Sequence, residues 1–477
     1  MGAAGLVVVP LRSSSTSRTT GLPRAPGRVP LLGHAWPMMR DPLRFAGSLS
    51  DRGDLVEVRL GPVRACVPCH PDLLWRVLTD DRTFDKGGPF FDRVRSTIGN
   101  GVGSCPYHEH RRQRRLIQPS FHPERLERYA TVMEQEAAAL TDEWEHGQIV
   151  DVYRALYGAA LRTVLRALFA TRLAAEAAAG FRESVETVLD QLTARMFLPR
   201  TLQRLPLPAN RRFDRAVADL RRGIESLVVE YRRGGTDRGD LLSALITARD
   251  ETARGQAVPG GDSLDDTEIH DQVLTMLAAG SDSVAAAVSW ALYLLDRTPA
   301  ALARLHREVD AVPGGGPASG GSVPELPYTG QVIMEALRLY PPGWLFTRVT
   351  TERTELGGYR LPPGTTVAFC APAVHRRAGL YDRPDAFDPD RWLPERARTL
   401  PKGAFAAFGG GARKCAGDTF GLTESTLLLA AVVGRWRLRR TPGSDVRPVA
   451  LSTALRPRRL LMEISARDAR TAQDGQS

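Results

Sequence analysis

The segment Phe408–Gly417 reads FGGGARKCAG and places Cys415 behind three consecutive glycines. Glycine has no Cβ, so the backbone of this segment can approach a flat ligand closely. We expect Cys415 to open a helix, where backbone N–H groups stabilise an anion. Together with the charges of Arg413 and Lys414, this predicts a lowered thiol pKa. A deprotonated sulfur is the form that binds a metal. The alternative is a buried free cysteine beside a glycine-rich turn.

The composition is that of a large soluble protein. The chain has 477 residues, of which 43% are hydrophobic and 25% are charged, so a sizeable core can be buried. Its formal net charge of +10 suits nucleic acid, an anionic membrane or an acidic protein partner. No strip of basic residues interleaved with aromatic residues supports nucleic acid. We therefore expect an acidic protein partner.

The sequence carries no signal for export or membrane insertion. The apolar run Leu6–Val9 is too short for a signal-peptide core, and no segment approaches the roughly 18 apolar residues of a membrane span. The five cysteines are an odd, sparse set and do not suggest a disulfide framework. We therefore expect a cytoplasmic protein without a membrane anchor.

Hydrophobic periodicity predicts helix over most of the chain. The longest helical pattern covers Thr267–Asp296, with acidic residues at its start. Alternation over Leu55–Val67 predicts a small hairpin. We see no linker and no internal repeat. The prediction is one mainly-α (α+β) domain with small β-sheets over residues 24–465, between disordered tails at 1–23 and 466–477.

The glycine-rich segment resembles the haem-binding loop of the cytochrome P450 family. That loop has the pattern Phe, two residues, Gly, one residue, Arg, one residue, Cys, one residue, Gly. Its five positions are met here by Phe408, Gly411, Arg413, Cys415 and Gly417. The resemblance implies the cytochrome P450 fold and a haem b (iron protoporphyrin IX) bound beside Phe408. It also implies Cys415 as the axial iron ligand and a propionate contact from Arg413.

Further stretches follow the order of this family. Glu335 and Arg338 are three residues apart on a predicted helix and share a face, a spacing that alone usually marks a surface ion pair. The segment FDPDRW, which contains Arg391, comes later in the chain. The resemblance implies that Glu335, Arg338 and Arg391 form a structural network around the thiolate loop. It also implies that Arg348 binds a haem propionate.

A basic helix is predicted within EHRRQRRLIQPSF. His110 and Arg114 are four residues apart, so both can reach one carboxylate. The resemblance implies that they bind the haem propionates. The alternative is a solvated basic helix, and Arg111, Arg112 and Arg115 fit that description or form part of a basic docking patch.

The segment AGSDS lies midway along the longest helix. Gly280 and two hydroxyls favour a loosened helical ladder that admits water. Asp282 beside Ser283 gives an acid–alcohol pair suited to proton delivery, and a small-residue packing patch is the alternative. The resemblance implies the proton-delivery role. The family usually has Thr where this chain has Ser283, and the missing β-methyl bears on how well oxygen use is coupled to product formation.

The run Cys66-Val67-Pro68-Cys69-His70 matches the signature of covalent c-type haem attachment. We expect no metal and no haem at this run. Such attachment normally occurs outside the cytoplasm, and the run is predicted to be a strand that ends at a helix start. A zinc site would need a second cysteine pair. In the family that the chain resembles, this place holds a small hairpin.

Apolar residues flank the motifs at five positions: Phe90, Phe91, Val284, Leu345 and Phe346. Core packing explains each of them singly. Together they predict a hydrophobic substrate with few polar anchors. The stretches LPLPANRRFDRA, EIHDQVLTMLAAGSDS, ELGGYRLPPGT and FDPDRWLPER resemble bacterial terpene-oxidising members of the family. That likeness implies a terpene substrate, of sesquiterpene type.

The resemblance thus implies a haem–thiolate monooxygenase that hydroxylates a hydrophobic small molecule in secondary metabolism. It would use dioxygen and electrons from a ferredoxin and an NAD(P)H-dependent ferredoxin reductase. We expect a monomer that binds no nucleic acid. The alternatives are a peroxygenase, an oxidative coupling enzyme, a fatty-acid or polyketide hydroxylase, and a non-catalytic haem sensor. The acid–alcohol pair favours the monooxygenase, and no DNA-binding segment supports a sensor.

Overall fold

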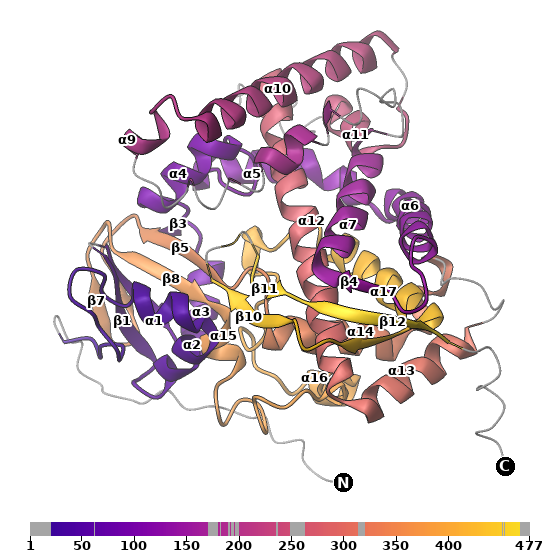
Figure 1. Cartoon of the computed structure of the whole chain (residues 1–477). Coiled ribbons are helices and arrows are strands. Elements are labelled where there is room, and N and C mark those ends of the chain that lie inside the picture. Colours follow the sequence, from indigo (N-terminus) through magenta and orange to yellow (C-terminus); the bar gives the residue numbers. More distant parts are fainter. Residues whose placement is uncertain are drawn as a thin grey trace.

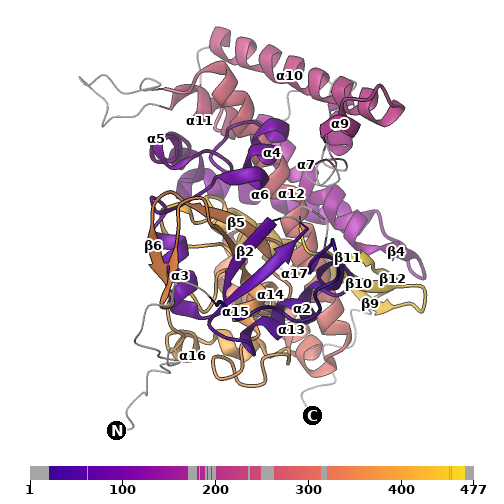
Figure 2. The same cartoon turned by 90° about the vertical axis from the view of Figure 1, so that its left-hand side faces the viewer.

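The computed structural model describes residues 21–467 except 62, 170–179, 182, 189–190, 192–194, 196–199, 235–236, 249–262, 313–319, 451 and 453. Helix α12 (Asp266–Asp296) runs through the centre of the molecule, with α7 (Val152–Phe169) and α17 (Asp418–Arg435) packed beside it (Figure 1). Helix α10 (Pro208–Gly234) lies across the top in both views, and a β-sheet lies below it (Figure 2).

Helices dominate the described chain, as the sequence predicts. The other α-helices are α1 (Ala35–Arg40), α2 (Pro42–Ser50), α3 (Pro71–Thr79), α4 (Gly88–Ile98), α5 (Tyr107–Ile117), α6 (Pro123–Asp142), α9 (Arg200–Gln203), α11 (Leu241–Thr247), α13 (Pro299–Ala311), α14 (Pro327–Leu339), α15 (Ala371–His375) and α16 (Pro394–Ala397). The 3₁₀ helices are η1 (Gln118–Phe121), η3 (Gly320–Glu325), η4 (Pro389–Trp392) and η5 (Gly411–Arg413).

Twelve short strands form the β part of the described chain. They are β1 (Leu55–Leu60), β2 (Val63–Pro68), β3 (Phe84–Asp85), β4 (Ile149–Asp151), β5 (Leu345–Thr350), β6 (Thr354–Leu356), β7 (Tyr359–Leu361), β8 (Thr366–Cys370), β9 (Trp436–Arg440), β10 (Asp445–Val449), β11 (Arg456–Arg459) and β12 (Leu461–Ala466). The largest sheet has the order β1-β2-β8-β5-β3, and the smaller ones are β4-β12-β9, β10-β11 and β6-β7.

The register of the large sheet brings distant residues together. β1 and β2 form the predicted hairpin, and β5 runs antiparallel to β8 with Arg348 opposite Val367. β3 pairs with β5 so that Asp85 lies opposite Val349. The sheet therefore places Arg348 beside the segment that follows β3.

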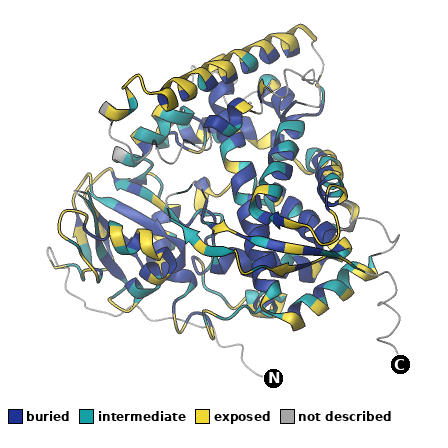
Figure 3. Cartoon of the chain, in the orientation of Figure 1, coloured by how far each residue is buried: buried dark blue, intermediate teal, exposed yellow. Residues whose placement is uncertain are grey.

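Helix α12 begins with a capping box. The Asp265 carboxylate accepts from the Glu268 N–H at 2.8 Å, and the Glu268 carboxylate accepts from the Asp265 N–H at 3.0 Å. The helix is buried on most sides (Figure 3), but Met276, Ala279 and Ser283 form a less buried stripe. These three positions share one helix face. The stripe is therefore the part of this face of α12 that the surrounding elements cover least.

Among the described helices, α12 alone is long and apolar enough to cross a membrane by length and composition. This departs from the expectation that no segment approaches such a span. In the structure 72% of its most apolar window is buried inside the protein, and buried polar residues such as Gln272 and Asp282 lie along it. Helix α12 is therefore the central core helix of this fold.

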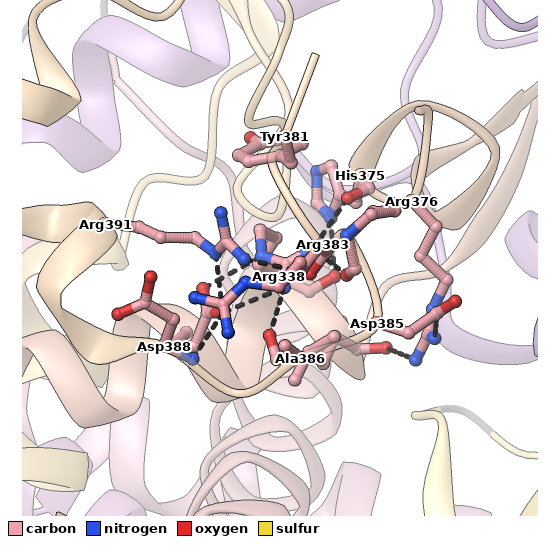
Figure 4. Close-up of polar contacts among 12 residues, drawn as sticks. Arg338, His375, Arg376, Tyr381, Arg383, Asp385, Ala386, Asp388 and Arg391 are labelled. Carbon is pink, nitrogen blue, oxygen red and sulfur yellow. Dashed lines mark hydrogen bonds and ion pairs between the residues drawn. The ribbon is translucent and has the colours of Figure 1, made fainter. Parts of the chain in front are cut away.

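A buried ion-pair network connects α14 to the segment that precedes the thiolate loop (Figure 4). Arg338 Nε and Nη2 each lie 2.8 Å from a carboxylate oxygen of Glu335, and both side chains are 0% exposed. Arg391 Nε lies 3.3 Å from the same carboxylate, and Trp392 Nε1 donates to it at 3.0 Å. Arg338 also donates to the carbonyls of His375, Pro384 and Ala386. The network thus holds residues 384–392 against α14.

Two boundaries differ from the sequence prediction. Helix α17 begins at Asp418, so Cys415 lies before the helix and does not open it. β12 continues to Ala466, and Arg467 donates to the carbonyls at positions 433 and 434, so the packed chain continues past residue 465. Most of the two predicted tails, residues 1–20 and 468–477, lies outside the described residues.

Glu424 on α17 is an acid buried in the core. Its two carboxylate oxygens accept no hydrogen bond within the described chain. Burial raises the pKa of the Glu424 carboxyl to about 8. The nearby Thr163 side chain lowers this pKa, and the charge of Glu136 raises it. The carboxyl is therefore protonated in the folded protein at neutral pH.

Replacing Arg338 with Lys should destabilise the protein by about 3 kcal/mol or more. An ammonium group cannot bond both carboxylate oxygens of Glu335 and the three carbonyls, so a buried charge would be left poorly paired. Chemical unfolding measures the loss. The control is Asp390→Asn, which breaks an exposed ion pair with Arg304 and should cost under about 1 kcal/mol. Equal losses in the two variants would contradict the assignment of this network as the main support of the segment.

Glu424→Gln should stabilise the protein increasingly as the pH rises. From about pH 4.5 to 8 the unfolded chain has released the Glu424 proton while the folded chain keeps it. The free energy of unfolding therefore falls by about 1.4 kcal/mol per pH unit and levels off above pH 8. The variant loses this slope, so its melting temperature should exceed that of the wild type most at the alkaline end. The exposed Glu127→Gln is the control, and a pH-independent difference for Glu424→Gln would refute the buried neutral acid.

Candidate active site

The loop around Cys415 packs tightly on α3. The Cys415 N–H donates to the Phe408 carbonyl at 2.9 Å and closes the loop. Gly411 has φ +64°, and a Cβ there would lie 2.6 Å from a carbonyl oxygen of α3. A Cβ at Gly410 would lie 2.8 Å from the Trp75 ring. These two glycines therefore permit close contact of the loop with α3, which is a reason for glycine that the sequence pattern does not reveal.

Cys415 is accessible, whereas the other four cysteines, all of them in the described chain, are buried. Desolvation by the surrounding loop raises the pKa of the Cys415 thiol. The Gly417 N–H, Arg114 and Lys414 pull in the opposite direction and do not outweigh it. The expectation of a lowered thiol pKa was therefore wrong. A bound metal ion deprotonates such a thiol itself, so the residue remains a competent ligand.

The four residues predicted to bind the haem propionates, His110, Arg114, Arg348 and Arg413, lie near one another. Burial lowers the pKa of His110 to about 3, and the charges of Arg413, Lys86, Arg114 and Arg348 lower it further in that order. Burial and then the charge of Arg413 lower the pKa of Arg348 to about 10. Charges shift one another's pKa strongly only at short range. The structure thus gathers several cations around a neutral His110.

Arg413 is held by residues of the segment between α3 and α5. Its Nη2 lies 2.8 Å from Asp85 Oδ1, and Nη1 donates to the Cys105 carbonyl at 2.7 Å. Its Nε lies 3.4 Å from Asp81 Oδ2 but forms no hydrogen bond with any described residue. Arg348 donates to the carbonyl of its own neighbour Thr347 at 3.0 Å.

These contacts leave positive charge and hydrogen-bond donors for an anion. Arg348 and Arg413 are both buried, and both nearby acids, Asp81 and Asp85, contact Arg413. A buried cation without a counter-ion is unfavourable. The propionates of a haem would supply the missing negative charge, and Cys415 would supply the sulfur ligand. The residues present therefore fit a haem b.

Helix α5 contacts the thiolate loop through Arg114. Arg114 Nη1 donates to the Lys414 carbonyl at 2.8 Å. Arg112, expected on a solvated or docking face, is buried and pairs with Glu268 of α12 at 2.5 Å, which corrects that expectation. Arg111 and Arg115 are exposed, as expected of a basic surface.

Asp282 and Ser283 point in different directions. The buried Asp282 carboxylate accepts a hydrogen bond from the Tyr153 hydroxyl on α7. Ser283 lies on the less buried stripe of α12 and donates to the carbonyl four residues back at 2.7 Å. A Cβ at Gly280 would lie 2.8 Å from a methyl group of α7. Gly280 therefore permits close packing of α12 on α7, as in the small-residue packing alternative.

The five apolar candidates differ in burial. Val284 is buried in the central cluster with α17, and Leu345 is partly buried against the cluster under β1 and β2. Phe346 is 37% exposed, and its side chain stands on the opposite face of β5 from Leu345. Phe90 and Phe91 form an edge-to-face pair with centroids 5.2 Å apart, in which Phe91 is buried.

The residues of the Cys66–His70 run have separate surroundings. Cys66 and Cys69 are buried, and burial raises the pKa of both thiols. His70 Nδ1 accepts the Asp72 N–H at 3.2 Å and caps α3. In the part of the chain that the structure describes, no group of three or more His, Cys, Asp or Glu is placed to hold a metal.

Sequence reasoning missed the partners that orient the site. Tyr153 holds Asp282, Asp85 holds Arg413, and Trp392 holds Glu335. Trp392 lies inside the quoted FDPDRW stretch, so a signal for it existed. The Tyr153–Asp282 pair joins positions 129 residues apart and leaves no local pattern.

Comparisons with known proteins agree with this geometry. A model of the cytochrome P450 family matches residues 23–463. Pentalenene oxygenase of Streptomyces avermitilis is 50% identical over 443 residues, which cover 93% of this chain and 97% of that protein. Cyclooctatin synthase of Streptomyces melanosporofaciens is 47% identical over 442 residues, 92% of this chain and 95% of that protein.

A solved structure, the heme domain of cytochrome P450DA, superposes with a TM-score of 0.83 at 26% identity, covering 94% of this chain and 99% of that one. The predicted mainly helical fold and the haem b cofactor are thereby confirmed. The chain belongs to the cytochrome P450 family and is a haem-containing monooxygenase.

Proposed function

We propose that this enzyme hydroxylates a terpene, of sesquiterpene type, in secondary metabolism. The observation that carries the proposal is the 50% identity with pentalenene oxygenase over nearly the whole of both chains. A third relative, cyclooctat-9-en-7-ol 5-monooxygenase of Streptomyces melanosporofaciens, is 41% identical over 444 residues and supports a terpene substrate as well. Phe346 is 37% exposed and lies on the same face of β5 as Arg348, which suits an apolar substrate.

The roles of the site residues follow from their contacts. Cys415 would supply the sulfur ligand of the iron, and the haem so bound would supply oxygen activation. His110, Arg114, Arg348 and Arg413 would hold the propionate edge of the haem, and the Phe408 carbonyl, which accepts from the Cys415 N–H, closes the loop.

Two further groups of residues act around that edge. Glu335, Arg338 and Arg391 hold the surroundings of the loop. Asp282, which accepts a hydrogen bond from Tyr153, would deliver protons together with Ser283. Ser283 lies on the less buried stripe of α12.

A ferredoxin is the proposed electron donor, with its NAD(P)H-dependent reductase. A hollow of about 230 Å³ lies beside Cys415, lined by Arg114, Lys414 and Phe121 among others. Arg111 and Arg115 are exposed on the same helix as Arg114. A basic surface next to the iron ligand suits an acidic protein partner. We further propose a cytoplasmic monomer.

The test is a titration of the ferric holoenzyme with pentalenene, followed by turnover with a ferredoxin, its reductase and NADPH. We expect a saturable spectral shift and a product that gains one oxygen atom. A long-chain fatty acid serves as the comparison ligand. Oxidation of the fatty acid without any spectral shift from terpene hydrocarbons would contradict the terpene proposal and favour the fatty-acid alternative.

Ser283→Thr should increase the share of NADPH that ends in product, because the added β-methyl restricts the hydroxyl to fewer rotamers. Ser283→Ala should lower that share and release more hydrogen peroxide. The matched control is Ser281→Ala, since Ser281 also donates to a carbonyl four residues back but is fully buried. If Ser281→Ala and Ser283→Ala change the product yield per NADPH equally, the assignment to Ser283 fails.

A further inference from the structure

Large apolar side chains gather at the surface between residues 31 and 39. Leu31 is 96% exposed, Leu32 47%, Trp36 53% and Met39 36%. These four, here called the apolar tip, are four of the ten large hydrophobic residues that lie exposed in the described chain. Trp36 and Met39 share one face of α1, which lies beside α2 at the front of the view in Figure 1. Exposed apolar side chains that cluster in this way mark an interaction surface.

The loop that carries the two leucines is held rigidly. Val29 and Gly33 exchange two backbone hydrogen bonds of 2.7 and 2.9 Å, which close a tight loop around Leu31 and Leu32. A Cβ on Gly33 would lie 2.2 Å from the Arg59 carbonyl oxygen of β1, so only glycine fits at the base of the loop. Leu31 has φ +62°, a conformation that leucine rarely adopts. The fold therefore presents Leu31 to the solvent at a conformational cost that contacts inside the protein do not offset.

The backbone around Leu32 has its polar groups paired within the protein. The Leu32 N–H donates to the Pro30 carbonyl at 2.7 Å. The Leu32 carbonyl accepts from the N–H of Ala35 at 3.2 Å and from the N–H of Gly61 at 3.1 Å. Unpaired backbone groups are costly where water is scarce, above all in lipid. The loop can therefore leave water at this point without losing the backbone hydrogen bonds of Leu32.

Positive charge surrounds the apolar tip. Arg28 precedes the loop, Arg40 ends α1 and Arg44 lies in the first turn of α2, and all three are exposed. None of these arginines has an ion-pair partner among the described residues. The exposed Asp41 accepts from the backbone N–H of Arg44 at 3.1 Å and caps α2. The surface around the tip is therefore complementary to an anionic partner.

We propose that the apolar tip and the arginines at 28, 40 and 44 form a peripheral docking surface for an anionic lipid bilayer. Leu31 and Leu32 enter the acyl region, Trp36 lies at the level of the headgroups, and the arginines pair with lipid phosphates. A nucleic acid or an acidic protein matches the arginines alone, whereas an anionic bilayer matches both the charges and the apolar side chains. The contact needs no membrane span, and it goes beyond the proposed function because it holds for any substrate.

The experiment measures co-sedimentation of the full-length holoenzyme with vesicles of equal parts phosphatidylcholine and phosphatidylglycerol. The wild type should bind these vesicles, bind them less at high salt, and bind pure phosphatidylcholine vesicles weakly. Leu31→Gly should lower the partition coefficient on the order of tenfold, because it removes a side chain that enters the lipid. It should not lower the melting temperature, since glycine accepts the backbone conformation of Leu31. The triple variant Arg28→Gln, Arg40→Gln and Arg44→Gln should lower the coefficient on the order of a hundredfold.

Two control variants change the same properties elsewhere on the surface. Ile149→Ser removes an apolar side chain that is 59% exposed on β4. Gln at the exposed positions 437, 439 and 440 of β9 removes three positive charges. Both controls should bind the mixed vesicles like the wild type. Absence of wild-type binding to the mixed vesicles, or equal binding by the tip variants and the controls, would overturn the proposal. A dimer in light scattering that Leu31→Gly converts to a monomer would also overturn it, because a second copy would then cover the tip.

Discussion

The buried ion pair between Glu335 and Arg338 holds residues 375–392 against α14. Two charges removed from water must be fully paired, and Arg338 therefore spends its donors on Glu335 and on carbonyls of the segment around residues 375–386. Arg391 and Trp392 return to the same carboxylate from the far end of that segment. The path from there to the loop of Cys415 is short in sequence, so the position of the sulfur depends on this network.

The opposite side of the site follows a different rule. The buried Arg348 on β5 and Arg413 in the thiolate loop lie near the acids Asp81 and Asp85, and both acids contact Arg413. Buried positive charges repel one another, so this arrangement favours a counter-ion. The propionates of a haem would supply that negative charge. The cofactor would then contribute to the packing of this enzyme as well as to its chemistry.

The sequence predicted those parts of the structure that leave local patterns. Acidic residues at the start of the longest helical pattern mark the start of α12, and the pattern from Phe408 to Gly417 marks the thiolate loop. The capping box itself, between Asp265 and Glu268, appears in the structure. Gly280 and Gly411 also permit close contacts with α7 and α3, which no local pattern reveals.

Contacts between distant segments account for what the sequence could not predict. Burial in the folded protein raises the thiol pKa of Cys415, against the expectation. Tyr153 orients Asp282 through a pairing that joins segments far apart in the chain, and such pairings appear only in the folded structure.

The measurement that tests the central claim most directly is the visible spectrum of the dithionite-reduced protein under carbon monoxide, recorded beside Cys415→Ser. The account predicts a strongly red-shifted Soret band in the wild type that disappears in the variant while haem remains bound. A red-shifted band that persists in Cys415→Ser, or haem in the wild type without that shift, would contradict Cys415 as the axial thiolate ligand.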